Sequence, residues 1–286
     1  IDIELTEDGL ANHEIVIEHF FHYVRLMSGD DLSRYFEEEK QMSTIDFQNL
    51  EPSAPLRTVQ MSSLLLQYFP TEHVVDFFSV YGEYNDELVR MYLSKLTPSN
   101  MQAILHAPIV KTNTKEPIYD TSYSVESLDA DLMRQWMESP IDPELSLPKP
   151  NIYIATQPKI TPGVYSEIPV MLKDELGLKV WYLHDSSFNV PHANVQVNIH
   201  TPLANQSIHN RVCNSLLGSL LSESIREFSY PLAKAGISVD ISSSWKGLHL
   251  ELSGYDEKQL EVLTELSRRI RSFELDEDQF LQEQSK

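Results

Sequence analysis

Apolar residues recur along this chain at spacings that predict a series of helices. Val16, Phe20 and Val24 follow one another at four-residue intervals, which places them on one face of a helix. Thr6 precedes this run as a candidate N-cap, and acidic residues follow it in the first helical turn. Similar spacing predicts further helices over residues 30–47, 56–69, 71–81, 86–96 and 127–138.

Alternation of apolar and polar residues predicts strands as well. In residues 1–5, isoleucine or leucine alternates with acidic residues, and a second strand is predicted over residues 101–106, after Pro98 ends a helix. A strand at a chain terminus needs partners to be stable, so the partners of residues 1–5 are expected to lie upstream, with the sequence beginning inside a domain.

The last third of the chain has the clearest pattern. Strands are predicted over residues 179–183 and 195–199, followed by a helix that Ser207 caps and that continues towards Phe228. A turn is predicted after it, at Pro231 and Gly236. A β-hairpin follows over residues 237–252, and after it a helix whose apolar stripe is Leu263, Leu266, Ile270 and Phe273. The order strand, strand, helix, hairpin, helix predicts an α+β fold in which helices cover a largely antiparallel sheet.

The middle of the chain is rich in proline. Seven of the sixteen prolines lie between Pro140 and Pro169, a density that disfavours both helix and central strand. We therefore predict two domains, over residues 1–148 and 177–286, joined by a linker over residues 149–176.

The charge balance narrows the class of partner. Asp and Glu total 43 against 22 Lys and Arg, which gives a formal net charge of −21 and makes nucleic acid an unfavourable partner. The acidic residues are interpreted as a solvated exterior, with attraction of basic peptides as the alternative. No apolar stretch approaches the roughly 18 residues that a membrane span requires.

Cys213 is the single cysteine, so an intramolecular disulfide and a thiolate zinc cluster are both excluded. It lies in an apolar helical segment and is predicted to be a small core residue, with a reactive thiol as the alternative.

Short motifs that occur in one order along the chain carry a resemblance to a known family. The first half contains Leu-Thr-Glu-Asp-Gly-Leu at residues 5–10, Leu-Thr-Pro-Ser-Asn at 96–100, Tyr-Asp-Thr-Ser-Tyr at 119–123 and Leu-Pro at 147–148. The second half contains Trp181, Asp185, Phe188, Pro191, Pro202 and the pair Gly254-Tyr255. Together these segments resemble the second and third domains of the pitrilysin and insulin-degrading enzyme family of zinc metallopeptidases.

The resemblance implies a longer parent protein. Its four related α+β domains would form two halves that close around a chamber for peptides and small unfolded proteins. This chain would supply the later part of the second domain, the joint between the halves and the earlier part of the third domain. Its expected partners are the remaining domains of the same polypeptide and peptide substrates.

The zinc motif of this family, H-x-x-E-H, does not occur in the sequence. Glu18-His19 has Ile15 where the first histidine of the motif would stand, and His13-Glu14 has Ile17 where a forward H-E-x-x-H motif needs its second histidine. No catalytic or zinc-binding residue is therefore assigned to this chain. Zinc is expected in the parent protein only, and the chain alone is expected to be inactive.

Two other groups of polar residues are candidates for chemistry. His19 and His22 are three residues apart on a predicted helix, with Glu18 beside them, and can hold zinc weakly if a third ligand converges. We interpret them instead as surface and boundary histidines. His184-Asp185 is either a base with its orienting acid or, as we favour, a polar pair at a strand end. No phosphate-binding glycine motif is present in the sequence.

An aromatic run comprises Phe77, Phe78, Tyr81 and Tyr84. It is predicted to be the core of a helix and its following turn, with an apolar patch on the chamber wall as the alternative. The sequence does not separate these readings, so the substrate-binding residues stay unknown.

The leading hypothesis is a non-catalytic middle segment of a zinc metalloendopeptidase. The alternative is a segment of an inactive homologue that binds peptides or serves as a structural core subunit. A third hypothesis, an unrelated acidic interaction module, requires the motif order to be coincidental. Resemblance to the bacterial branch of the family predicts a periplasmic location, with the cytoplasm as the alternative.

Overall fold

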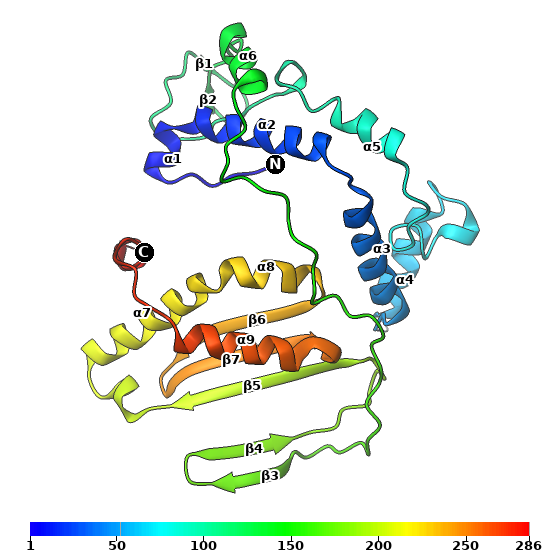
Figure 1. Cartoon of the computed structure of the whole chain (residues 1–286), viewed down its shortest axis with the longest axis vertical. Coiled ribbons are helices and arrows are strands. Elements are labelled where there is room, and N and C mark those ends of the chain that lie inside the picture. Colours follow the sequence, from blue (N-terminus) through cyan, green and yellow to red (C-terminus); the bar gives the residue numbers. More distant parts are fainter. Residues whose placement is uncertain (52, 286) are drawn as a thin grey trace. The chain divides into compact units, whose positions relative to one another are not determined.

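The computed structural model describes residues 1–51 and 53–285. The chain divides into two compact units, Ile1–Phe36 with Glu83–Pro150 and Glu37–Gly82 with Asn151–Lys286. Helices and small antiparallel sheets together make an α+β fold, as predicted (Figure 1).

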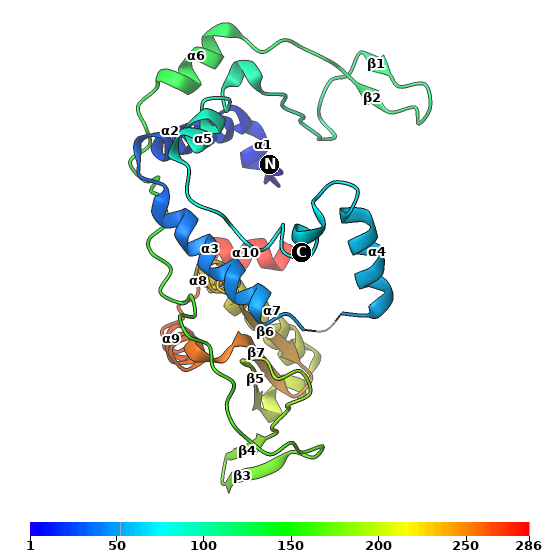
Figure 2. The same ribbon diagram turned by 90° about the vertical axis from the view of Figure 1, so that its right-hand side faces the viewer.

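The first unit is mainly helical. Its elements are α1 (Glu7–Ala11), α2 (His13–Gly29), α5 (Asp86–Leu93), the 3₁₀ turn η2 (Pro98–Asn100), β1 (Thr114–Lys115), β2 (Ser122–Tyr123) and α6 (Ala130–Glu138). Helix α2 packs against α6, α1 and α5 (Figure 2). Phe21 of α2 and Trp136 of α6 are both 1% exposed, and their rings stack with centroids 6.1 Å apart.

The second unit contains most of the remaining elements. They are α3 (Ser33–Gln48), whose first turn belongs to the first unit, α4 (Pro55–Leu65), η1 (Thr71–His73), β3 (Val170–Glu175), β4 (Leu178–Tyr182), β5 (His192–His200), η3 (Pro202–Asn205), α7 (Ile208–Ser224), α8 (Arg226–Lys234), β6 (Ile237–Ser244), β7 (Gly247–Tyr255), η4 (Asp256–Lys258), α9 (Gln259–Arg271) and α10 (Glu277–Ser285).

A three-stranded antiparallel sheet in the order β5-β7-β6 organises this unit. Helices α7, α8 and α9 pack on one face of it (Figure 1). The core between the layers is apolar, and Leu232, Leu252, Val262 and Leu266 within it are fully buried. The strands β3 and β4 form a separate two-stranded hairpin.

Most predicted elements of the last third are confirmed, including the hairpin β6–β7 and the helix α9. The predicted long helix is divided at Ile225 into α7 and α8. Of the turn predicted at Pro231 and Gly236, the Gly236 part is confirmed, with a φ of +73°, whereas Pro231 lies inside α8. Glycine adopts this backbone conformation without steric cost.

Three predictions in the first half of the chain are wrong. Residues 1–5 and 101–106 do not form strands. Residues 1–5 fail because the alternating pattern finds no neighbouring strand to pair with. Residues 71–81 form only the turn η1 and irregular turns, since their valine and phenylalanine residues are weak helix formers.

Cys213 is exposed, so its predicted place in the core is also wrong. Helix α7 buries Gly218, Leu220 and Leu221 in its C-terminal half. Its N-terminal half does not reach the core, and Val212 beside Cys213 is 60% exposed. Within the described part of the chain, no helix combines the length and the apolar character that crossing a membrane requires.

Candidate functional site

The first feature of the second unit is a segment of irregular backbone, residues 151–161, which we call the docked connection. Asn151 Nδ2 donates to the carbonyl oxygen of Pro231 at 2.7 Å, and Gln41 Nε2 donates to the carbonyl oxygen of Ala155 at 2.9 Å. Residues from α3 and from α8 therefore hold the docked connection by its backbone and side chains.

Glu257, in the turn after β7, holds the next part of the docked connection. Its carboxylate accepts hydrogen bonds from the Thr156 and Gln157 backbone amides at 3.1 and 2.8 Å, and from Thr156 Oγ1 at 2.8 Å. Burial alone would raise the pKa of Glu257, but the amide donors of Gln157 and Thr156 outweigh it and lower the pKa. Glu257 thus binds the segment as an ionised group.

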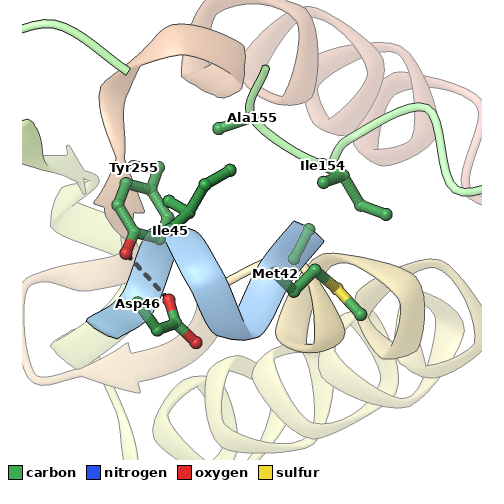
Figure 3. A pocket seen from close by; sticks show the side chains of 7 residues that line it. Met42, Ile45, Asp46, Ile154, Ala155 and Tyr255 are labelled. Carbon is green, nitrogen blue, oxygen red and sulfur yellow. Dashed lines mark hydrogen bonds between the residues drawn. The ribbon is translucent and has the colours of Figure 1, made fainter. Parts of the chain in front are cut away.

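A narrow pocket lies beside the docked connection (Figure 3). Its lining residues are Met42, Ile45, Asp46, Ile154, Ala155, Ala235 and Tyr255. The pocket leaves no room for a water molecule, and its lining surface is almost entirely apolar. It is therefore a packed joint between α3, the docked connection and the end of the sheet, rather than a cavity for a ligand.

Tyr255 is the polar centre of this joint. Its ring is 5% exposed, and its hydroxyl donates to Asp46 Oδ1 at 2.8 Å (Figure 3). Burial and the Asp46 carboxylate both raise the pKa of the Tyr255 phenol. The His192 ring meets the Tyr255 ring edge-on with centroids 4.6 Å apart, and His192 Nδ1 lies 3.7 Å from Glu51 Oε1.

The second feature is the sheet face opposite the helices. Aligned cross-strand positions there are polar in successive rows: Asn194, Ser253 and Ser238, then Gln196, Glu251 and Asp240, then Asn198, His249 and Ser242. Asn194 Nδ2 donates to Glu251 Oε1 at 2.6 Å, and His249 Nδ1 lies 3.0 Å from Asn198 Oδ1. We call these nine residues the polar sheet face. None of them is buried.

The polar sheet face carries two acidic residues, Glu251 and Asp240, and Glu251 is held in its ionised form. The hydrogen bond from Asn194 lowers the pKa of Glu251, although burial opposes the shift. Asp240 stands directly opposite Glu251 across the β6–β7 ladder. The polar sheet face therefore carries negative charge, amides and hydroxyls without an apolar side chain among its nine positions.

The histidines of α2 do not have the surroundings expected from the sequence. His22 is 4% exposed rather than at a boundary, and its Nε2 lies 2.9 Å from Ser139 Oγ. His19 Nε2 lies 3.3 Å from Asp142 Oδ2. Within residues 1–51 and 53–285, no three or more His, Cys, Asp or Glu side chains are grouped so that they could hold a metal ion.

His184 and Asp185 form hydrogen bonds with different residues. Asp185 Oδ1 accepts hydrogen bonds from the backbone amide and hydroxyl of Ser187, which lower the pKa of its carboxyl group. His184 Nδ1 lies 3.2 Å from the Tyr182 hydroxyl. Asp185 therefore caps its own turn and does not orient His184 as a base.

The aromatic run does not form a helical core, so that prediction is wrong. Phe77 stacks on Phe69 with ring centroids 3.6 Å apart, and Phe78 meets both rings edge-on. Phe77 and Phe78 are 49% and 66% exposed. Tyr84 belongs to the first unit, where its hydroxyl donates to Asp86.

The family resemblance drew attention to Gly254-Tyr255, but the sequence analysis missed the partner of Tyr255, Asp46, which lies 209 residues away in sequence. No local pattern signals this pairing. The alternation along β6 and β7, in contrast, is a signal that could have identified the six residues of the polar sheet face on these two strands.

Residues 47–286 match the family model described as the middle or third domain of peptidase M16. The chain belongs to the peptidase M16 family. It is 28% identical to human insulin-degrading enzyme over 288 residues, which covers 98% of this chain and 28% of that protein. It is 27% identical to the A-factor-processing enzyme of Saccharomyces cerevisiae over 286 residues, with the same coverage.

A crystal structure of pitrilysin has a similar fold, with a TM-score of 0.75 and 27% sequence identity over 99% of this chain and 30% of that one. The chain thus spans less than a third of each of these relatives. The predicted resemblance to the middle segment of the pitrilysin and insulin-degrading enzyme family is confirmed.

Proposed function

We propose that this M16 middle segment is a non-catalytic part of a zinc metalloendopeptidase that degrades peptides and small unfolded proteins. In this proposal the segment forms part of the chamber wall and of the joint between the two halves of the parent protein. The names of its relatives, insulin-degrading enzyme and A-factor-processing enzyme, support a peptide substrate.

The polar sheet face is the observation that carries the chamber-wall role. Among the described residues, α7, α8 and α9 pack on one side of the sheet, and none of the nine residues on the other side is buried, so that side can face a substrate. Amides, hydroxyls and carboxylates on that side can form hydrogen bonds with many peptide sequences, because peptide backbones present the same donors and acceptors whatever their side chains. Such a surface is suited to holding unfolded polypeptides without selecting one sequence.

The docked connection supports the role as a joint. Hydrogen bonds with Glu257, with Gln41 and with the carbonyl oxygen of Pro231 fix residues 151–157, within the proline-rich segment, on the second unit. A rigid attachment at this point lets a movement of one half be transmitted to the other without local unfolding of the segment.

Zinc would be bound elsewhere in the parent protein, since the sequence of this chain contains no H-x-x-E-H motif. The purified chain is therefore expected to leave a quenched fluorescent peptide intact, with or without added zinc. Hydrolysis that a chelator abolishes, and that follows the chain through purification, would contradict the non-catalytic role.

The chamber-wall role has a separate test. A photo-crosslinking amino acid at Ser238, on the polar sheet face, is expected to label an unfolded polypeptide added in solution. The matched control carries the same amino acid at Leu260 of α9, which is 77% exposed in the helical layer on the other side of the sheet. Equal labelling at both positions would contradict a substrate-facing role for the sheet.

We further propose a periplasmic location for the parent protein, on its resemblance to the bacterial branch of the family. Fractionation of the native source tests this, and recovery of the parent protein with cytoplasmic markers would support the alternative.

A further inference from the structure

His22 of α2 is a buried histidine whose hydrogen bonds define its tautomer. Its Nδ1 accepts the backbone N–H of Asp142 at 3.3 Å. An N–H group can only donate, so Nδ1 carries no proton in this arrangement. The proton of the neutral ring is therefore on Nε2, which lies 2.9 Å from Ser139 Oγ and donates to it. This tautomer cannot act as a base towards Ser139, so the pair is not a nucleophile and its activator.

His22 and Arg25 together attach the segment that follows α6 to α2. Arg25 lies about one helical turn from His22, and its guanidinium donates to the carbonyl oxygens of Met137 and Ser139 at 2.8 and 2.5 Å. Residues 137–142 are thus bound through their backbone at three points. They contain Pro140, the first proline of the proline-rich part of the chain.

The groups that face the His22 ring have opposite effects on its pKa. On α2 these are Glu18, with Oε1 3.8 Å from Nε2, His19 and Arg25, and on the bound segment the group is Asp142. Burial and the positive charge of Arg25 lower the pKa of His22, and His19 adds to this, whereas Glu18 and Asp142 oppose it. The net effect favours the neutral ring that the geometry requires.

We propose that His22 is a proton-sensitive latch that holds residues 139–142 on α2 at neutral pH and releases them on acidification. Protonation would turn Nδ1 from an acceptor into a donor, and this donor would face the Asp142 N–H. The hydrogen bond to the backbone would be lost, and a buried positive charge would lie beside Arg25. The device would loosen the chain at the start of the proline-rich segment while leaving α2 folded.

The sign of the pH dependence follows from linkage. The pKa of His22 is lowered in the folded chain, so the latch is fully stable above the ordinary value of 6.5. As the pH falls below 6.5, the open state binds the proton more readily than the closed state. The stability of the latch declines until the pH has passed below the folded pKa.

Amide hydrogen exchange measured by NMR on the whole chain tests the proposal. The protection factor of the Asp142 amide, which is corrected for intrinsic exchange, is expected to fall by roughly threefold or more between neutral and mildly acidic pH, as linkage requires. In His22→Asn the side-chain oxygen can still accept a hydrogen bond but does not titrate, so the protection should become independent of pH. His13→Asn, on the same helix but outside the groups that face the His22 ring, is the matched control and should keep the wild-type response.

Two results would overturn the latch: an Asp142 protection factor that is constant with pH in the wild type, or an unchanged pH response in His22→Asn. A measurement on the wild type alone keeps the proposal testable if that variant does not fold. Nitrogen chemical shifts of the His22 ring should show a neutral ring with the proton on Nε2 at neutral pH. A proton on Nδ1 would contradict the latch.

Discussion

The Tyr255 hydroxyl at the end of β7 donates a 2.8 Å hydrogen bond to Asp46 of α3. This bond joins the sheet to a helix from the first third of the chain, next to the docked connection (Figure 3). The bond fixes the position of α3 on the end of the sheet, because the phenol is buried and its hydroxyl reaches the Asp46 carboxylate.

Replacement of Tyr255 by Phe removes this hydrogen bond and keeps the ring. We expect the free energy of unfolding to fall by about 1 kcal/mol, since Asp46 is exposed and can bind water instead. Urea denaturation followed by circular dichroism measures the change. Tyr230→Phe is the control, because Tyr230 is 65% exposed and should change stability little. A Tyr255→Phe variant as stable as this control would contradict the role of the hydrogen bond.

Gly254 has a backbone conformation that other residues avoid. Its φ is +122°, and a Cβ atom there would lie 2.0 Å from the carbonyl oxygen of Gly236. Gly254→Ala should therefore destabilise the chain by about 2 kcal/mol or more, through both strain and displacement of the neighbouring strand. Thermal unfolding provides the measurement. Gly82→Ala, where a Cβ atom meets nothing within 4 Å, is expected to unfold at nearly the wild-type temperature.

Glu257 should make stability depend on acid pH. Its pKa is lowered from 4.5 in the folded chain, so its contribution is present above that value and is lost as the pH falls through the folded pKa. Glu257→Gln removes the charge and should lower stability at neutral pH. The stability difference between wild type and variant, measured by urea titrations, should shrink on acidification. A difference that stays constant across this pH range would exclude the ionised carboxylate as the cause.

Leu266 of α9 is fully buried in the core of the second unit. Leu266→Ala should cost about 2–5 kcal/mol, the range observed when a buried leucine is truncated and leaves a cavity. Leu260→Ala lies on the same helix at a position that is 77% exposed, and should cost far less. Chemical denaturation of the two variants separates burial from the change in helix propensity, which is the same for both.

Sequence patterns predicted the second half of the chain better than the first, for a physical reason. The hairpin β6–β7 combines two adjacent alternating runs, so the partner of each strand is local and its polar face can be recognised from sequence. Residues 1–5 show a similar alternation, but their pattern has no adjacent partner and yields no strand. For the same reason, Glu257 and Asp46 gave no signal: their partners are fixed by contacts between distant parts of the chain.

The sequence pattern of α2 did not identify the buried position of His22. Its neighbours along the helix include both apolar and charged residues, so the burial depends on α6 packing over it from more than a hundred residues away. Cys213 shows the opposite error, since it was predicted to be buried and is exposed. An apolar stripe predicts a buried face only where the opposing layer is long enough to cover it.

The sequence separation of 209 positions between Asp46 and Tyr255 also means that one is synthesised well before the other. At ribosomal rates of about 5–20 residues per second, α3 emerges roughly 10–40 s before the residue that completes its joint. During this interval the apolar side chains of Met42 and Ile45 have no sheet to pack against. The joint therefore exposes apolar side chains on the nascent chain during this interval, and a chaperone that binds there would act before the second unit can fold.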